Sequence, residues 1–233
     1  MANQYGPKIV TDGLTCLLDA GNSKSYPGSG TSWFDISGNG KNFTWDTVDW
    51  TSGYFNTYSS SVFRRATGPA SNSFGINNTS GYTIFFIFQT TTGGGNAGFK
   101  FKGSGLLSGS TRGIFCHPGW TNDTIYFDQG GCCNGDQRIS YTNSNVNDSN
   151  IWNMVGLRST VATRAILYNG IVGTTTSTAA ANINLDSNPV LINPFDESYS
   201  WNGRLAYFAV YSRGLSDAEY LNNYNALKGR FSL

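Results

Sequence analysis

Residues 201–219 read WNGRLAYFAVYSRGLSDAE, and this stretch decides the fold of the chain. Its first part predicts one long strand from Leu205 to Tyr211. Strict alternation would place Leu205, Tyr207, Ala209 and Tyr211 on one face and Ala206, Phe208 and Val210 on the other. Because both faces are mostly apolar, we expect this strand in the middle of a sheet.

A capped helix is predicted directly after this strand. Ser216 and Glu219 have the spacing of a capping box, in which each side chain binds the backbone amide of the other residue. Leu215 and Tyr220 occupy the positions of a hydrophobic staple. The apolar stripe at helical spacing consists of Tyr220, Tyr224 and Leu227. Gly229 lies at a natural stop, so we expect the helix to end there.

The rest of the chain predicts short strands separated by turns rich in Gly, Asn, Ser and Asp. The predicted strands are 14–19, 61–64, 82–89, 98–102, 113–116, 124–128, 138–141, 153–158, 164–168, 171–175, 190–192 and 205–211. Asn169-Gly170 is the signature of a type I′ hairpin turn. The pattern indicates an all-β protein: a two-sheet antiparallel β-sandwich of the jelly-roll kind with one short C-terminal helix. We expect a single domain over residues 1–233, with its core from about 10 to 230.

The composition excludes two classes of partner. The 233 residues carry a net charge of +1 and only 12% charged residues, against about 25% in an average domain. Nucleic-acid binding needs a concentrated field of Lys and Arg, which this chain lacks. Its most apolar run, residues 82–88, is far too short to span a bilayer and suits a strand buried on both faces. We therefore expect neither a nucleic acid nor a membrane as partner.

The N-terminal residues lack the apolar core of a secretory signal, so we expect a protein made in the cytosol, with its cysteines as thiols. The four cysteines are Cys16, Cys116, Cys132 and Cys133. The main expectation for them is burial as small apolar side chains. Two alternatives stay open: a vicinal disulfide between Cys132 and Cys133, or a zinc site that adds Cys116 and His117. If Cys116 and His117 share a strand they face opposite sides, which argues against a Cys–His pair.

Both ends of the chain resemble one known domain type. The motifs LLDAGN (17–22), YPGSG (26–30) and WFDISGNG (33–40), together with the closing stretch 201–219, are similar to laminin-G-like jelly rolls of the concanavalin A-like lectin/glucanase superfamily. The resemblance extends to IYFD (125–128), GGCC (130–133), RIS (138–140) and the segment from Trp152 to YNG (168–170). This form looks most like the domains found in virion proteins of tailed bacteriophages. The residues after Gly40 depart from the pattern.

The carboxylates do not predict an enzyme. Glycoside hydrolysis needs two carboxylates that flank one bond. Glu197 and Glu219 are the only glutamates, and Glu219 is explained by the helix cap. Asp196 and Glu197 are adjacent, so on a strand they would point to opposite faces. We predict a non-enzymatic protein with no catalytic residues.

Carbohydrate binding needs an exposed aromatic face beside amide and carboxylate groups. The first candidate set is Trp120 with Asn122 and Asp123, and Trp33 beside Asp35 is the second. The alternative for Trp120 is a loop anchor, and the alternative for Asp35 is turn chemistry. No metal site is predicted. Calcium is the one cofactor considered, and its candidate oxygen donors are Asp12, Asp19, Asp123 and Asp128.

The resemblance implies a bacteriophage virion surface protein, such as a capsid decoration, a fibre or a tail-associated component. It would bind other virion proteins, and its rim loops would contact host glycans. The alternative is a free-standing carbohydrate-binding lectin, assisted by calcium. A glycan hydrolase or lyase is a third class that no sequence feature favours. A homo-oligomer fits such a protein, although nothing in the sequence encodes one.

Overall fold

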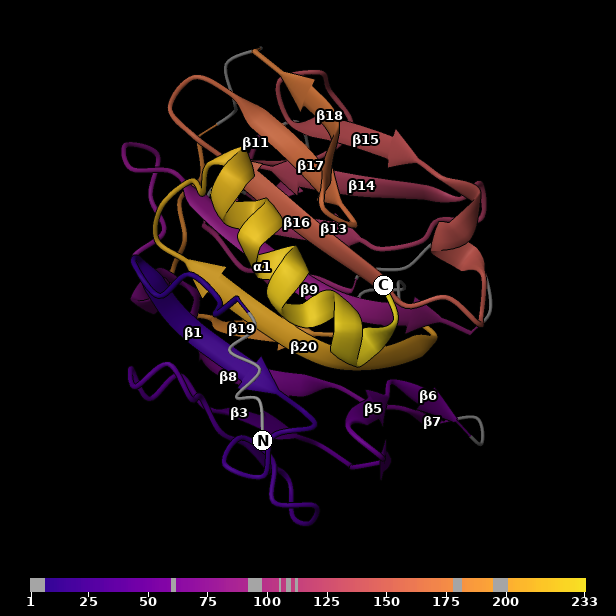
Figure 1. Ribbon diagram of the computed structural model, residues 1–233. Coiled ribbons are helices and arrows are strands. Elements are labelled where there is room, and N and C mark those ends of the chain that lie inside the picture. Colours follow the sequence, from indigo (N-terminus) through magenta and orange to yellow (C-terminus); the bar gives the residue numbers. More distant parts are fainter. Residues whose placement is uncertain are drawn as a thin grey trace.

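Two antiparallel β-sheets face each other in the computed structural model, and the helix α1 (Asp217–Phe231) covers the outer face of one of them (Figure 1). The structure describes residues 7–59, 62–91, 98–104, 106–107, 110–111, 113–177, 182–194 and 201–233. This arrangement confirms the predicted sandwich with a C-terminal helix. Among these residues, no helix has the length and apolarity needed to cross a membrane.

The sheet that carries α1, named here the helix-side sheet, has eight strands. Their order is β18 (Ile171–Thr176), β17 (Arg164–Tyr168), β16 (Asn153–Ser159), β9 (Tyr82–Thr90), β20 (Gly203–Tyr211), β5 (Tyr54–Asn56) and β4 (Trp50–Thr51), and β1 (Leu14–Asp19) also pairs with β20. As predicted, β20 lies inside the sheet. Asn169 and Gly170, between β17 and β18, have φ of 43° and 85°, as a type I′ turn requires.

The opposite sheet, named here the far sheet, also has eight strands. Their order is β15 (Arg138–Thr142), β14 (Thr124–Gln129), β13 (Ile114–His117), β10 (Phe99–Phe101), β19 (Pro189–Ile192), β8 (Ala66–Ala70), β3 (Phe43–Trp45) and β2 (Ser32–Trp33). Two small hairpins and two 3-10 turns complete the described elements. They are β6 (Tyr58–Ser59) with β7 (Val62–Phe63), β11 (Leu106–Leu107) with β12 (Ser110–Thr111), η1 (Ser71–Phe74) and η2 (Ser144–Asn147).

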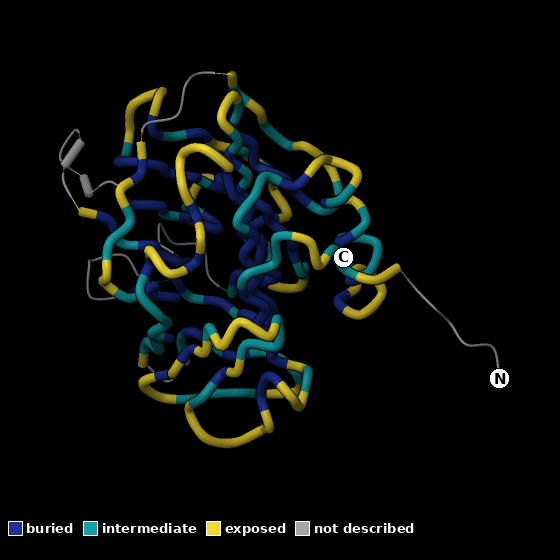
Figure 2. Tube along the Cα trace, turned by 90° about the vertical axis from the view of Figure 1, so that its left-hand side faces the viewer, coloured by how far each residue is buried: buried dark blue, intermediate teal, exposed yellow. Residues whose placement is uncertain are grey.

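Two apolar layers hold the elements together. The larger one lies between the sheets and is rich in aromatic rings, among them Phe86, Phe99 and Phe208. The second lies between the helix-side sheet and α1. Figure 2 shows the buried segments gathered in the middle of the molecule and the exposed ones in the connecting loops. Apolar burial of this kind is the main favourable term in folding.

The face assignment within β20 is wrong at its beginning. The pairing of β20 with β9 shifts between Leu205 and Tyr207, which is a β-bulge. Leu205 therefore packs between the sheets with Phe208, whereas Ala206 faces outward with Tyr207. The extra residue of a bulge breaks the period of two on which the alternation rule rests. Ala206 thus lies on the same outer face as α1.

The start of α1 follows the sequence and its end does not. Ser216 and Glu219 form the predicted capping box, and Tyr220 and Leu227 are buried. The helix runs past Gly229 to Phe231 and is capped by Ser232 in a left-handed conformation. Tertiary contacts stabilise this extra turn, since the Arg230 guanidinium binds the Asp19 carboxylate and the Phe231 ring packs at 6.1 Å from that of Trp152.

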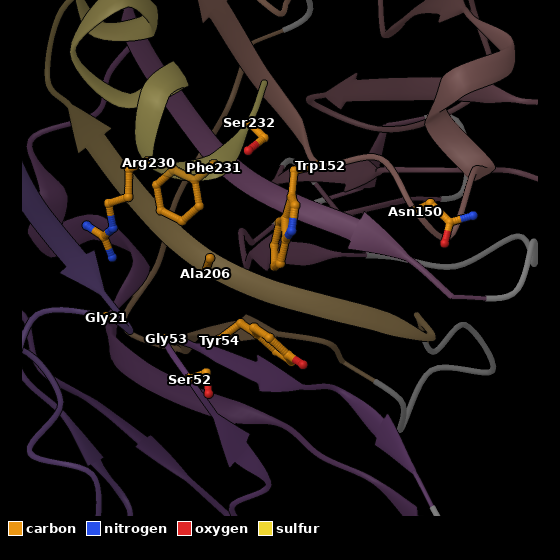
Figure 3. A pocket seen from close by; sticks show the side chains of 10 residues that line it. All are labelled: Gly21, Ser52, Gly53, Tyr54, Asn150, Trp152, Ala206, Arg230, Phe231 and Ser232. Atoms are coloured by element: carbon orange, nitrogen blue, oxygen red, sulfur yellow. The ribbon is translucent and has the colours of Figure 1, made fainter.

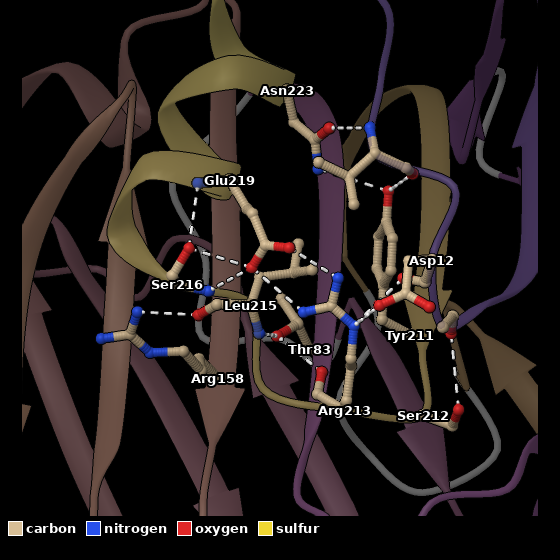
Figure 4. A network of polar contacts seen from close by, with 12 residues as sticks. Asp12, Thr83, Arg158, Tyr211, Ser212, Arg213, Leu215, Ser216, Glu219 and Asn223 are labelled. Atoms are coloured by element: carbon tan, nitrogen blue, oxygen red, sulfur yellow. Dashed lines mark hydrogen bonds and ion pairs between the residues drawn. The ribbon is translucent and has the colours of Figure 1, made fainter.

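The capping box is part of a larger polar network (Figure 4). Arg213 donates to both carboxylate oxygens of Glu219, at 3.0 and 2.6 Å, and the Ser216 amide donates to the same carboxylate at 2.8 Å. The network extends to the N-terminal segment, because the Val10 amide donates to Asn223 and the Val10 carbonyl accepts from Tyr211. It therefore fastens the beginning of the chain to the helix.

We expect the Glu219 carboxylate to make stability depend on pH. The Arg213 guanidinium, followed by the Ser216 amide, lowers the pKa of Glu219 to about 2. A depressed folded-state pKa gives stability that is complete above the unfolded-state pKa of about 4.3 and is lost as the pH falls toward 2. After allowance for solvent screening, Glu219→Gln should cost about 1 kcal/mol at pH 6.

The measurement is the free energy of unfolding of both proteins in urea between pH 2 and pH 7. The difference between them should shrink toward pH 2. Asp217→Asn is the matched control, because Asp217 is two-thirds exposed beside its partner Arg158 and should change stability less. A difference that stays constant from pH 2 to pH 7 would contradict the role given to Glu219.

Candidate functional site

Three aromatic side chains gather where β13 turns into β14. His117 is the last residue of β13, Trp120 lies in the connecting loop, and Tyr126 belongs to β14. The Trp120 ring stands edge-to-face against His117 at 5.2 Å and against Tyr126 at 5.9 Å. Trp120 and Tyr126 are both partly exposed. This group supplies an aromatic surface at one end of the far sheet.

The loop that carries Trp120 is held by backbone and amide hydrogen bonds. The Trp120 amide donates to the Thr124 carbonyl, and the Asp123 amide donates to the Trp120 carbonyl, both at 2.9 Å. The Asn147 amide group donates to the Trp120 carbonyl at 2.7 Å and to the Asp123 carboxylate at 2.8 Å. Asp123 has a φ of 59°, a left-handed conformation that Asp tolerates. Asn147, which belongs to η2 and not to this loop, therefore helps to hold the loop in position.

The structure brings three of the four sequence-predicted site residues together. Trp120, Asn122 and Asp123 share this loop, and the Asn122 amide group lies 3.4 Å from the Tyr126 hydroxyl. Asn122 is exposed, whereas the carboxylate of Asp123 binds Asn147. The loop thus offers one exposed amide, which donates to the Tyr126 hydroxyl, and one structural carboxylate.

Trp33 lies elsewhere, in the core between the two sheets. Its exposed fraction is 0%, and its ring packs against Phe55 at 4.9 Å and Trp45 at 6.0 Å. A fully buried ring has no face for a sugar, so Trp33 does not belong to a site in this structure. The neighbouring Asp35 follows the turn alternative, since its carboxylate accepts from the amides of Leu17, Ser37 and Lys41.

A buried ion pair supports the aromatic group from the sheet. Asp128 is 1% exposed although its side chain lies on the outer face of the far sheet, opposite to the inward Phe127. Arg138 of β15 donates to both oxygens of Asp128, at 2.5 and 2.6 Å, and its guanidinium lies 4.6 Å from the centre of the Tyr126 ring. These hydrogen bonds raise the pKa of Arg138. His117 Nε2 lies 3.5 Å from the same carboxylate.

We name this group the rim cluster: His117, Trp120, Asn122, Asp123, Tyr126 and Arg138. Asp128 fixes Arg138 from below, and Arg138 in turn covers one side of the Tyr126 ring. Fixed aromatic rings beside an amide and a guanidinium suit an uncharged or weakly anionic ligand with several hydroxyl groups. Sequence reasoning missed Tyr126 and Arg138. The signal that could have found them is the alternation of polar residues along β14 and β15.

The four cysteines form two buried thiols and one disulfide. Cys16 and Cys116 are buried thiols, as expected, and burial raises the pKa of both. Cys132 and Cys133 form a vicinal disulfide, so the expectation of burial as thiols is wrong for this pair. Cys116 faces the core while His117 faces outward, which confirms that the two do not pair.

Where the structure describes them, the carboxylates considered for metal or catalytic roles have protein partners. The described part of the chain contains no group of three or more His, Cys, Asp or Glu side chains that could hold a metal ion. Asp12 binds Arg213, Asp19 binds Arg230, and Glu219 caps α1. Asp196 and Glu197 lie outside the described residues. Within the described residues, the two carboxylates at the rim cluster, Asp123 and Asp128, are likewise held by Asn147 and Arg138.

Comparison with known proteins supports the fold of this chain. No sequence-family profile matches the chain, and no curated protein matches it in sequence. Solved structures do match. Trypanosoma rangeli sialidase aligns with a TM-score of 0.65 and 11% identity, over 94% of this chain and 33% of the sialidase.

Two binding domains align about equally well. The binding domain of botulinum neurotoxin DC in complex with SialylT has a TM-score of 0.63 and 12% identity, over 93% of this chain and 52% of that one. The binding domain of Paraclostridial Mosquitocidal Protein 1 has a TM-score of 0.64 and 15% identity, over 92% and 52%. This chain thus spans only a third to a half of the structures that it resembles. At such identities the likeness establishes the β-sandwich fold.

Proposed function

We propose that this chain is a non-enzymatic binding domain that holds glycans at the rim cluster and is displayed on the surface of a bacteriophage virion, where it docks on other virion proteins. The observation that carries the glycan part is the fixed aromatic surface of Trp120 and Tyr126 beside Asn122 and Arg138. The resemblance of the motifs in residues 17–40 and 201–219 to phage-encoded jelly rolls supports the virion part. Matched folds that include a sialidase and toxin binding domains are consistent with a glycan ligand.

The rim cluster fits glycan binding for physical reasons. Its rings are held by edge-to-face contacts and by the Arg138 guanidinium, so little conformational entropy is lost when a sugar stacks on them. Two of the three nitrogens of Arg138 bind Asp128, which leaves the third for a hydroxyl or carboxylate of the ligand. Asp128 neutralises this guanidinium, so the cluster does not require an anion.

A glycan array probed with the wild-type protein and with Trp120→Ala tests the glycan part. We expect specific binding to at least one glycan and a loss of about tenfold or more in Trp120→Ala, since aromatic anchors dominate such sites. Trp120 lies in a surface loop, so the variant should stay folded. Phe34→Ala removes another exposed aromatic, 40% exposed, and should leave binding unchanged. Equal binding by all three proteins would contradict a site at Trp120.

The cofactor and the virion role have their own tests. We expect binding on the array to be unchanged by a chelator, because Asp123 and Asp128 already bind Asn147 and Arg138. Chelator-sensitive binding would favour the alternative of a calcium-assisted lectin. For the virion role, mass spectrometry of purified phage particles should find the protein at high copy number, and its absence from the particles would refute that role.

A further inference from the structure

An open groove of about 540 Å³ lies on the outer face of the helix-side sheet (Figure 3). One wall is the C-terminal end of α1 with Phe231, and the other is the turn between β4 and β5. Ala206, turned outward by the bulge in β20, forms its floor. The volume lies within the ~300–1,000 Å³ that small-molecule sites occupy. The rim cluster lies on the other sheet, so this groove is a separate feature.

The aromatic walls of the groove are held in place. The Tyr54 and Trp152 rings contact each other at 5.6 Å with an angle of 57°. The guanidinium of Arg204 lies 5.2 Å from the centre of the Tyr54 ring, and Phe231 packs against Trp152 at 6.1 Å. Tyr54 and Trp152 nevertheless stay partly exposed toward the groove. Rings that are fixed and still accessible form a preorganised stacking surface.

The guanidinium of Arg230 reaches the groove, and the carboxylate of Asp19 offsets its positive charge. Arg230 binds both carboxylate oxygens of the buried Asp19 at 2.5 Å, while 40% of its own side chain is exposed. A β-carbon at Gly21 would lie 2.3 Å from the Arg230 guanidinium, so glycine is needed to admit it. A guanidinium carries five N–H groups, and this pair uses two of them. The others can donate to a ligand.

The charge around the groove favours a neutral ligand. Asp19 offsets the positive charge of Arg230, and the C-terminal end of α1 adds a partial negative charge. Arg204, which contacts Tyr54 and binds Gln89, is not among the residues that line the groove. A carboxylate or phosphate would therefore gain little here. Hydroxyl groups of a neutral molecule would still find fixed hydrogen-bond donors.

Two serines at the edge have an unusual backbone. Ser52 and Ser232 line the groove with φ of 46° and 54°, in the left-handed region that glycine or asparagine normally occupies. Serine at such positions costs conformational energy and supplies a hydroxyl that glycine would not. Both serines line the groove together with Tyr54 and Trp152.

From these observations we infer that this groove is a second binding site, and that its ligand is a neutral oligosaccharide of a few hexose units. The Tyr54 and Trp152 rings would stack on the C–H faces of the sugar. Arg230, Ser52 and Ser232 would bind its hydroxyls. The inference does not depend on the rim cluster, because no residue is shared between the two sites.

The test is a titration monitored through Trp152. The protein is labelled with 5-fluorotryptophan, and Trp152→Phe assigns the fluorine resonance of Trp152. The probes are maltotriose, cellotriose and chitotriose, each up to 20 mM, with 3′-sialyllactose as an anionic comparison. We expect at least one neutral probe to shift the Trp152 resonance with saturation, and the sialylated probe to shift it less.

Two variants separate binding from folding. Tyr54→Ala should weaken binding at least tenfold, and Ser52→Gly should weaken it about threefold without lowering Tm, because glycine adopts the φ of Ser52 more easily. Trp120→Ala should leave this titration unchanged, which distinguishes the groove from the rim cluster. The inference is overturned if no neutral probe shifts Trp152 at 20 mM, if the anionic probe shifts it more strongly than every neutral one, or if the shift persists in both groove variants.

Discussion

Trp33→Ala is expected to lower the free energy of unfolding by about 3–5 kcal/mol, which is the cost typical of removing a fully buried large aromatic side chain. Trp33 is 0% exposed and packs among Trp45 and Phe55 between the sheets. The substitution removes apolar burial and leaves a cavity that the surrounding strands fill only in part. Urea denaturation monitored by far-UV circular dichroism measures the loss directly.

Trp33→Phe is the milder partner of this variant. It keeps an aromatic ring in the core and should cost about half as much or less. It should also bind glycans on the array as the wild type does, because Trp33 does not reach the surface. A loss of glycan binding in folded Trp33→Phe, or a Trp33→Ala variant as stable as the wild type, would contradict the buried position of this residue.

The long periodic strands were predictable from sequence, and the bulge was not. β9, β14 and β16 each contain a continuous run rich in apolar and β-branched residues, which is long enough to predict a strand. Within β20 the same rule fails at Leu205 and Ala206, since a bulge adds one residue without any mark in the sequence. The pairing partner decides where it falls. The bulge turns Ala206 to the outer face of the sheet, where it lies beneath the groove.

The strands between residues 32 and 70 were mostly missed. β2, β3, β5 and β8 have only two to five residues each, too few for a period to show. β8 also contains Gly68 and Pro69, which normally argue against a strand. Gly68 is required because a β-carbon there would lie 2.4 Å from the Phe43 ring. Because β2 has only two residues, no pattern indicated that Trp33 is buried, and its sequence context predicted an exposed aromatic residue in a loop.

The two candidate sites differ in how far sequence could reveal them. Trp120, Asn122 and Asp123 are neighbours in the chain, so their residue types alone could indicate a candidate site. Tyr126 and Arg138 join them only through strand register, in which His117 pairs with Tyr126 and Asp128 with Arg138. The groove is assembled from segments that lie up to about two hundred positions apart, as the contact of Asp19 with Arg230 illustrates. No local pattern encodes such a meeting.

Asn193→Ala is expected to cost about as much as the loss of Trp33, although it removes only a small side chain. Asn193 is 0% exposed and adopts a φ of 53° at the end of β19. Its amide group donates to the carbonyls of Thr57 and Arg64, at 3.1 and 2.9 Å, and its oxygen accepts from the Trp201 amide at 2.6 Å. One side chain thus joins three segments that are distant in sequence.

The expected cost has two separable parts. Leaving buried partners without their hydrogen bonds costs ~1–3 kcal/mol for each group, and placing alanine in the left-handed region adds ~1–2 kcal/mol. Because the Thr57 carbonyl keeps the Arg64 amide as a donor, we expect about 3–5 kcal/mol in total. Asn193→Gly accepts the same φ and lacks the same hydrogen bonds, so it should be more stable than Asn193→Ala by about 1 kcal/mol. Equal stability of the two variants would show that backbone strain plays no part, and wild-type stability in both would show that the three hydrogen bonds do not hold this end of the sandwich together.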